Sequence, residues 1–113
     1  EIYTLSLHDA LPILVIGSAD PAGFDIVVNA TPLGMKAGDP LPINVERIPP
    51  HAYVGEVVLS AEVTPFLAAA RARGCQGQGG LDMLYEQIPA YLAYFGLPVA
   101  TPGQLRALAN PMA

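Results

Sequence analysis

The sequence predicts an α/β fold in which helices flank a parallel β-sheet. Two apolar runs rich in β-branched residues, Phe24–Asn29 and Tyr53–Leu59, are typical of strands that are largely buried in such a sheet. Helical patterns follow the second run, and strands that alternate with helices indicate parallel pairing. The length of 113 residues suits at most one modest domain.

Turn-forming residues bound the predicted strands. Leu14–Ile16 is a short apolar run followed by Gly and Ser, which predicts the end of a strand. Lys36–Pro50 contains four prolines and little periodicity, so we expect a surface connection there. The glycine-rich stretch Cys75–Gly80 predicts a third strand and a turn that enters a helix.

A short helix is predicted directly after the second strand. Thr64 can cap the free amides of its first turn, and Pro65 suits that turn because its fixed backbone angle is already helical. We expect this helix to cover Phe66–Arg73 and to stop at Gly74.

A longer helix with an apolar stripe comes next, and we expect this stripe to pack in the core. Pro89 is expected to interrupt and kink the helix, and Gly96 to end it. Thr101 with Gln104 forms a capping-box start for a last helix that reaches about Asn110. The stripe is formed by Leu81, Leu84, Ile88, Leu92 and Phe95, which recur at spacings of three and four.

The composition indicates apolar surface that something else covers. Apolar residues make up 52% of the chain and charged residues 13%, whereas about a quarter of residues are charged in ordinary soluble domains. A missing segment of a longer polypeptide and an oligomer interface would both account for this excess. We favour a fragment, and the sequence leaves the oligomeric state open.

Charge and cysteine content limit the classes of binding partner and the cell compartment that we expect for this protein. The net charge is −5 and the five cations are scattered, so we expect no nucleic-acid binding. Cys75 is alone, no Cys/His cluster suggests a metal site, and a reducing cytoplasm is the default compartment. No apolar run approaches the roughly 18 residues of a membrane span, and no export signal is recognisable.

The first thirteen residues resemble a translated oligonucleotide. Glu1–Ile13, EIYTLSLHDALPI, matches residue by residue the translation of a sequencing-adapter oligonucleotide. We therefore set it aside and expect the native sequence to begin near Leu14. His8 and Asp9 resemble a catalytic pair, yet on this interpretation they carry no chemistry. The alternative is a genuine amphipathic N-terminus.

Two stretches could carry chemistry. Gly74–Gly80 superficially suggests a phosphate loop, but counted from Gly77 its sixth position is Asp82, where a dinucleotide fingerprint needs Gly or Ala. Asn29–Met35 follows a strand with polar, Pro and Gly residues, at the sheet edge where open α/β folds bind ligands. A capped strand end, with Asn29 bonded to backbone groups, is the alternative.

Glu56 is a charged residue inside an apolar run. An unpaired acid in such a run would be costly. It therefore lies at an exposed strand end or accepts hydrogen bonds from a specific donor.

The order of these motifs resembles the C-terminal half of shikimate dehydrogenase. NATPLGM at Asn29–Met35, an acid-containing strand, TPFL at Thr64–Leu67 and GLDML followed by Gln87 come in that family's order and spacing. The resemblance covers about Asp25–Gly96. It implies that residues 14–113 are the C-terminal part of a Rossmann-type NADP-binding domain, with the C-terminal helices.

The family interconverts shikimate and 3-dehydroshikimate by hydride transfer. Its catalytic Lys and Asp, and its glycine-rich phosphate loop, precede the NATP motif, so the resemblance assigns no catalytic residue to this chain and implies an inactive fragment. It places Asn29, Thr31, Val57 and Gly80 at the cofactor, and Leu59 and Gln87 at the substrate.

Two motifs depart from the family pattern. The family commonly shows D-x-x-Y in its second strand, where this chain has Glu56 and Leu59, and G-L-G-M-L where it has Asp82. Loss of the Tyr removes a substrate hydrogen bond, so quinate or another hydroxylated cyclic acid is an alternative substrate, and NAD an alternative cofactor. A non-catalytic Rossmann-type binding module remains a further alternative.

Overall fold

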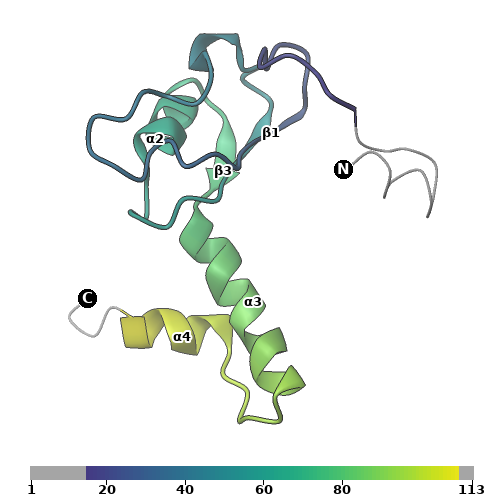
Figure 1. Cartoon of the computed structure of the whole chain (residues 1–113), viewed down its shortest axis with the longest axis vertical. Helices are drawn as coiled ribbons and strands as arrows, with labels where there is room; N and C mark the ends of the chain where they lie inside the picture. Colours follow the sequence, from purple (N-terminus) through teal and green to yellow (C-terminus); the bar gives the residue numbers. More distant parts are fainter. Residues whose placement is uncertain (1–14, 110–113) are drawn as a thin grey trace.

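The protein is described here by a computed structural model that covers residues 15–109. In this range three short strands form one parallel sheet with the spatial order β1-β2-β3 (Figure 1). The expectations for Glu1–Ile13, Leu14 and Asn110 lie outside the described residues. The elements, in chain order, are β1 (Ile26–Asn29), the 3₁₀ helix η1 (Val45–Arg47), β2 (Tyr53–Glu56), α2 (Pro65–Ala72), β3 (Gln76–Gln78), α3 (Gly80–Tyr94) and α4 (Pro102–Ala109).

The register of the sheet aligns the carboxyl ends of its strands. Asn29, the last residue of β1, pairs with Glu56, the last residue of β2. Gly55 of β2 in turn pairs with Gln78, the last residue of β3. The segments that follow the three strands therefore all start at one edge of the sheet.

One face of the sheet carries the core. Val27 and Val54 point to this face, and α2 packs over it with Phe66 and Leu67. Gly77 of β3 lies under Leu67, where a side chain would collide with the Val54 carbonyl. The buried core comprises Val45, Ile48, Ala52, Val54, Phe66, Leu67, Ala70 and Cys75.

The opposite face of the sheet is bare in the described residues. Ile26 is 67% exposed and Val28 57%, and Tyr53 on the neighbouring strand is exposed as well. The prediction that Phe24–Asn29 and Tyr53–Leu59 are buried strands is therefore wrong in extent. The strands are shorter, and alternate residues of β1 face solvent because α2 covers one side only.

Two further expectations about the N-terminal half are corrected. Val15 and Ile16 form no strand and are exposed. Lys36–Pro50 is more than a surface connection, because Val45 and Ile48 from this stretch enter the core. The 3₁₀ turn η1 makes this possible: Asn44 caps it by accepting a hydrogen bond from the Glu46 amide.

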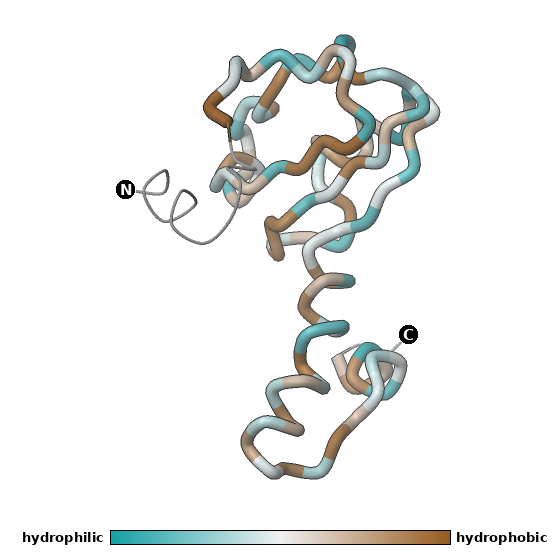
Figure 2. Tube along the Cα trace, turned by 90° about the vertical axis from the view of Figure 1, so that its right-hand side faces the viewer, coloured by the Kyte–Doolittle hydropathy of each residue, from teal (hydrophilic) through white to brown (hydrophobic). Residues whose placement is uncertain are grey.

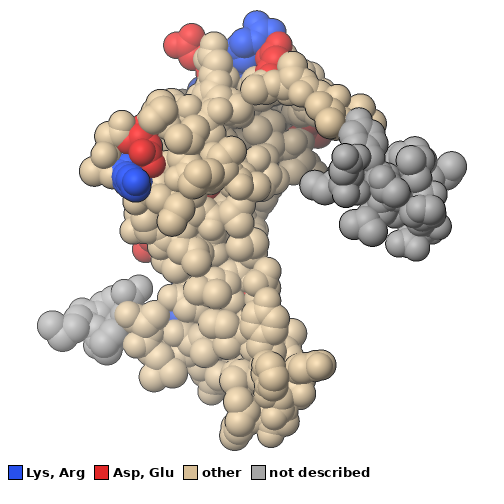
Figure 3. All heavy atoms as spheres, viewed as in Figure 1, with Lys and Arg blue, Asp and Glu red and all other residues tan. Residues whose placement is uncertain are grey.

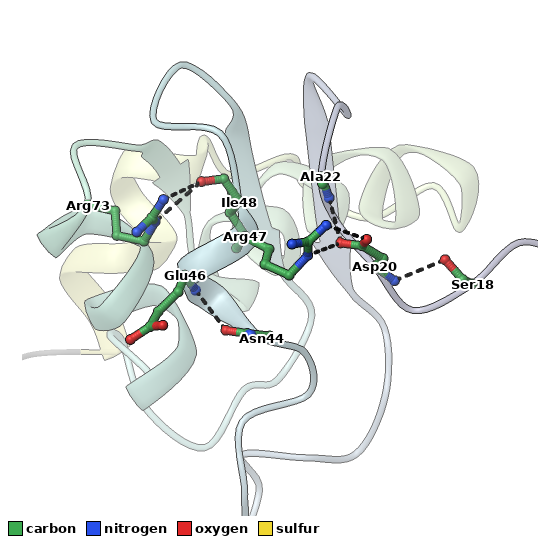
Figure 4. Close-up of polar contacts among 8 residues, drawn as sticks. All are labelled: Ser18, Asp20, Ala22, Asn44, Glu46, Arg47, Ile48 and Arg73. Carbon is green, nitrogen blue, oxygen red and sulfur yellow. Dashed lines mark hydrogen bonds and ion pairs between the residues drawn. The ribbon is translucent and has the colours of Figure 1, made fainter.

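Ionic and polar contacts tie this connection to its neighbours (Figure 4). Arg47 of η1 makes two hydrogen bonds of 2.8 Å to the Asp20 carboxylate, which also accepts from the Ala22 amide. The Arg47 guanidinium, with help from that amide, lowers the pKa of Asp20 from 3.8 to about 2. Arg73, at the end of α2, donates to the Ile48 carbonyl.

The signals for α2 are confirmed. The hydroxyl of Thr64 accepts a hydrogen bond from the Leu67 amide, and Pro65 opens the helix. Gly74 follows the helix with a φ of 94°, a left-handed conformation that glycine adopts without strain. The third strand predicted from Cys75–Gly80 is also present, as β3.

Helix α3 leaves the sheet instead of packing on it. It projects from the end of β3, and α4 folds back beside it (Figure 1). Brown, apolar segments continue along α3 and the loop after it (Figure 2). The expectation that the stripe packs in the core is wrong, since only Gly80 and Tyr85 of this helix are buried and Phe95 is 70% exposed.

The ends of α3 and α4 agree with their sequence signals, with one exception. Gly96 has a φ of 68° just beyond α3. The capping box of α4 is reciprocal: the Thr101 amide donates to the Gln104 side chain, and the Gln104 amide donates to the Thr101 hydroxyl. Pro89, however, lies inside α3 without ending it.

The described surface has few charges on the two C-terminal helices. In the view of Figure 3 the charged side chains gather around the sheet, while α3 and α4 are largely tan. None of the helices within residues 15–109 is both long and apolar enough to cross a bilayer. Within the same range, no group of three His, Cys, Asp or Glu residues has a metal-binding arrangement.

Candidate cofactor and substrate site

Most of the predicted ligand residues lie at the carboxyl edge of the sheet. β1 ends at Asn29, β2 ends at Glu56, and α3 begins at Gly80 directly after β3. Open α/β sheets bind their ligands in the crevice outside this edge, because the loops that follow the strands converge there. Five of the six residues that the sequence predicts as ligands lie at this edge.

A buried carboxylate lies at the centre of the edge. Glu56 is 3% exposed, and its Oε1 accepts hydrogen bonds from Asn29 Nδ2 at 2.9 Å and from the Val58 amide at 3.0 Å. Its Oε2 accepts from Thr64 Oγ1 at 2.8 Å. Of the two explanations for an acid in this strand, the structure therefore selects the one with specific donors.

Asn29 uses both ends of its amide. Its nitrogen donates to Glu56 and, at 3.0 Å, to the Leu33 carbonyl. Its oxygen accepts from the Thr31 amide at 3.1 Å and from the Thr31 hydroxyl at 2.7 Å. With 2% of its surface exposed, Asn29 shapes the loop after β1 and directs no polar group outward.

The glycines at the start of α3 are explained by close backbone contacts. A Cβ on Gly80 would lie 2.6 Å from the Val58 carbonyl oxygen and 2.7 Å from that of Val57. A Cβ on Gly79 would lie 2.7 Å from the Glu62 carbonyl oxygen. Any side chain here would displace α3 from the loop that follows β2, so the helix position depends on both glycines.

The remaining predicted ligands differ in accessibility. Thr31 and Leu59 are exposed, and Val57 is half-buried beside Gly80. Gln87 is exposed and accepts a hydrogen bond from the Tyr91 hydroxyl at 3.3 Å. Because it is seven residues along α3 from Gly80, it lies about 10 Å down the helix axis. The structure thus brings together all of these residues except Gln87.

A cavity that no sequence motif indicates lies beside the edge. It has a volume of about 260 Å³ and lies between the Leu33–Pro42 loop and Ser60, Pro65 and Phe66. The hydroxyl of Ser60 donates to the Gly34 carbonyl across it. Asp39 orders the loop by accepting from the amides of Gly34 and Lys36.

Comparison with known proteins identifies the family. No family model matches the chain. Shikimate dehydrogenase (NADP(+)) of Acidiphilium cryptum is 43% identical over 94 residues, which are 81% of this chain and 34% of that protein. The enzyme of the same name from Nitrobacter winogradskyi is 43% identical over 84 residues, 74% of this chain and 30% of that protein.

Comparison with solved structures finds dehydrogenases of the same kind. A shikimate dehydrogenase from Aquifex aeolicus matches with a TM-score of 0.71 at 27% identity, covering 93% of this chain and 40% of that one. A quinate dehydrogenase from Corynebacterium glutamicum in complex with NAD matches with a TM-score of 0.66 at 32% identity, covering 78% of this chain and 32% of that one.

This chain is homologous to a part of shikimate dehydrogenase. It spans about a third of the length of the curated relatives that it matches. The sequence-based resemblance is thereby confirmed, and so is the predicted α/β class with a partial Rossmann-type parallel sheet and flanking helices. The assignment of individual ligand residues stays a prediction.

Asp82, one of the departures from the usual shikimate dehydrogenase pattern, has a structural partner. Its carboxylate lies 2.6 Å from an Arg106 guanidinium nitrogen, and the same guanidinium lies over the Tyr85 ring, 4.8 Å from its centroid. Arg106 therefore fastens α4 to the first turns of α3. In the sequence Asp82 stands out as a departure, but Arg106 is not recognisable as its partner, because a separation of 24 residues follows no local pattern.

Thr64 is a second residue whose role the sequence shows only in part. The sequence identifies it as a helix cap. The structure adds that the same hydroxyl donates a hydrogen bond to Glu56 while it accepts a hydrogen bond from the Leu67 amide. A Thr eight residues after an acid is too weak a signal to predict this contact.

Proposed function

We propose that this chain belongs to a dehydrogenase that transfers a hydride between NADP and the ring of shikimate or a similar hydroxylated cyclic acid. The observation that carries the proposal is the convergence at one sheet edge of the NATPLGM loop, the loop after β2 and the Gly79–Gly80 helix start. The 43% identity to shikimate dehydrogenases supports the same conclusion. NADP is the expected cofactor, and NAD is the alternative.

The residues at the edge fit a nicotinamide cofactor in part. Val57 offers an apolar, half-buried side chain next to the backbone of Gly80, which suits the flat face of a nicotinamide ring. Thr31 offers an exposed hydroxyl. Asn29 fits less directly, since its polar atoms bond Thr31, Leu33 and Glu56. When bound, the nicotinamide supplies the hydride chemistry.

The contribution of this chain to the reaction is binding and orientation. Val57 and Gly80 would hold the ring at the edge, and Thr31 would bound the cleft on the β1 side. Gln87, about two turns along α3, would donate to and accept from substrate hydroxyls. No residue of this chain is assigned a proton-transfer role in the proposal.

A chimera tests the proposed function. In the Acidiphilium cryptum enzyme, the matching segment is replaced by residues 15–109 of this chain, and reduction of NADP by shikimate is followed by absorbance. We expect turnover by the chimera and none by the isolated chain, which spans about a third of its relatives. A folded chimera without turnover would contradict the proposal, and turnover by the isolated chain would contradict the expectation that it is inactive.

A quinate-type parent is the second candidate. The observation that favours it is Leu59, an exposed apolar residue where the family commonly has a Tyr that holds substrate. A site without that hydroxyl loses one discriminating hydrogen bond. The chimera assayed with shikimate and quinate, each with NADP and NAD, distinguishes the two, and Leu59→Tyr should shift the preference toward shikimate.

A non-catalytic binding module is the remaining alternative. It would bind a nucleotide without turnover in any chimera. The cytoplasmic location and the absence of nucleic-acid and membrane partners, both expected from the sequence, stay predictions.

A further inference from the structure

We infer that Glu56 is a positioning residue whose carboxylate sets the relative placement of the three segments that carry the predicted ligands. The inference rests on the proposed function, because it concerns the device that orders the same site. The three segments are the loop after β1, the loop after β2 and the first turn of α3.

Hydrogen bonds hold the first two segments, the loop after β1 and the loop after β2, to the Glu56 carboxylate. Asn29 donates to its carboxylate and, through its own oxygen, fixes Thr31. The Val58 amide donates to the same carboxylate, and Val58 lies between the predicted ligands Val57 and Leu59. Both loops therefore take their positions from a single group.

The third segment is held through Val58. The amide of Val58 bonds Glu56, while its carbonyl oxygen lies where only a glycine at position 80 avoids collision. A shift of the loop would therefore move the start of α3. Because a helix is stiff, such a shift would be carried along the helix to Gln87, two turns away.

Helix α2 completes the arrangement. The Thr64 hydroxyl donates to Glu56 Oε2 at 2.8 Å, and Thr64 caps α2. The carboxylate thus lies at the amino end of a helix that is packed into the core, where the helix dipole favours negative charge. This anchor gives the two loops a fixed reference in the sheet.

The chemistry of the cluster requires a carboxylate. Three donors converge on its two oxygens, and an ionised carboxylate is acceptor-only with about four lone-pair sites. Within residues 15–109, the ion pairs involve other acids, so hydrogen bonds alone compensate the burial of Glu56. Glutamine would present an NH₂ group to donors, and aspartate would fall one methylene short.

Amide hydrogen exchange of the full chain tests the inference without any ligand. The variants are Glu56→Gln and Glu56→Asp, with Glu86→Gln, an exposed acid on α3, as the matched control. Reporter amides are Thr31, Val58 and Asp82, one from each segment. The reference is the Cys75 amide, which bonds the Ala70 carbonyl and so reports on general loss of stability.

We expect Glu56→Gln to accelerate exchange at all three reporters by about 10-fold or more relative to Cys75. Glu56→Asp should accelerate the same three amides by a smaller factor, and Glu86→Gln should change none. Equal acceleration at Cys75 would reduce Glu56 to a stability role and overturn the inference. Acceleration at Val58 alone would overturn it too. If Glu56→Gln does not fold, the Glu56→Asp ratios decide.

A second measurement separates this inference from the proposed function. NADPH fluorescence is titrated against the chimera with the Acidiphilium cryptum enzyme and against its variants. The unchanged chimera should bind NADPH, Glu56→Gln should weaken binding by at least the factor seen in exchange, and Glu86→Gln should not. Absence of binding in the unchanged chimera would count against the proposed function alone, while the exchange ratios would still decide the role of Glu56.

Discussion

The hydroxyl of Thr64 and the carboxylate of Glu56 are 2.8 Å apart, and both side chains are buried. The same hydroxyl accepts a hydrogen bond from the Leu67 amide at 3.3 Å. One oxygen therefore both caps α2 and holds Glu56 at the end of β2. This contact joins the core of the domain to its candidate site. It also makes Thr64 a sensitive position.

Thr64→Val should therefore destabilise the protein more than the loss of an ordinary cap. It removes the cap of α2 and leaves Glu56 with one donor fewer, which together should cost about 2–4 kcal/mol. Urea denaturation measures this change. Thr64→Ser retains the hydroxyl and serves as the control, with an expected loss of about 1 kcal/mol or less. Equal losses for both variants would show that the hydroxyl contributes little.

Gly80→Ala should destabilise the start of α3. The added Cβ would lie within 2.8 Å of backbone atoms of Val57 and Val58, which cannot move aside as a flexible side chain could. A loss of about 1–3 kcal/mol is expected. The control is Gly103→Ala in α4, where the Cβ would meet only the Thr101 hydroxyl at 3.9 Å. Thermal unfolding of both variants measures the difference, and a neutral Gly80→Ala would contradict the close approach.

The ion pair of Asp20 with Arg47 should make stability depend on acid pH. The hydrogen bond from Arg47, then that from the Ala22 amide, lowers the pKa of Asp20 from 3.8 to about 2. A carboxyl whose pKa is lower in the folded state stabilises above its unfolded pKa, and this contribution is lost as pH falls from about 4 to about 2.

Urea midpoints of the unchanged chain and of Asp20→Asn between pH 2 and 6 provide the test. The difference between them should be constant above about pH 5 and vanish near pH 2. It should be small and should shrink with added salt, because the pair is exposed. A difference that grows toward low pH would contradict the direction of the shift.

Asp82 and Arg106 should be energetically coupled. The pair is half exposed, with a contact of 2.6 Å, and the guanidinium also lies over Tyr85. A double-mutant cycle with Asp82→Asn and Arg106→Gln should give a coupling of about 0.5–1 kcal/mol. Limited proteolysis of the loop between α3 and α4 should accelerate in both single variants. Zero coupling would show that α4 is held by other contacts.

The two faces of the sheet should respond differently to the same substitution. Val54→Thr places a hydroxyl in the core, where Val54 is fully buried, and should cost about 1–3 kcal/mol. Val28→Thr on the bare face should stay within about 0.5 kcal/mol. Both positions are strand residues with similar propensity, so urea denaturation compares burial directly. A large loss for Val28→Thr would mean that its face is covered in solution.

The sequence by itself determined most local features of this protein. Thr64 with Pro65, Thr101 with Gln104, and Gly74 and Gly96 mark helix ends, because caps and left-handed glycines act over three or four residues. The parallel α/β class followed from alternating strands and helices. The order of the motifs likewise identified the family.

Only the tertiary structure decided which apolar residues are covered and what surrounds each polar one. Periodicity shows that a face is apolar and cannot show how much packs on it, so the partial exposure of the α3 stripe and the bare face of β1 were not foreseen. The pairing of Glu56 with Asn29 joins residues 27 positions apart, and that of Asp82 with Arg106 joins residues 24 apart. Such contacts arise when separate elements fold to one place, which no local sequence pattern encodes.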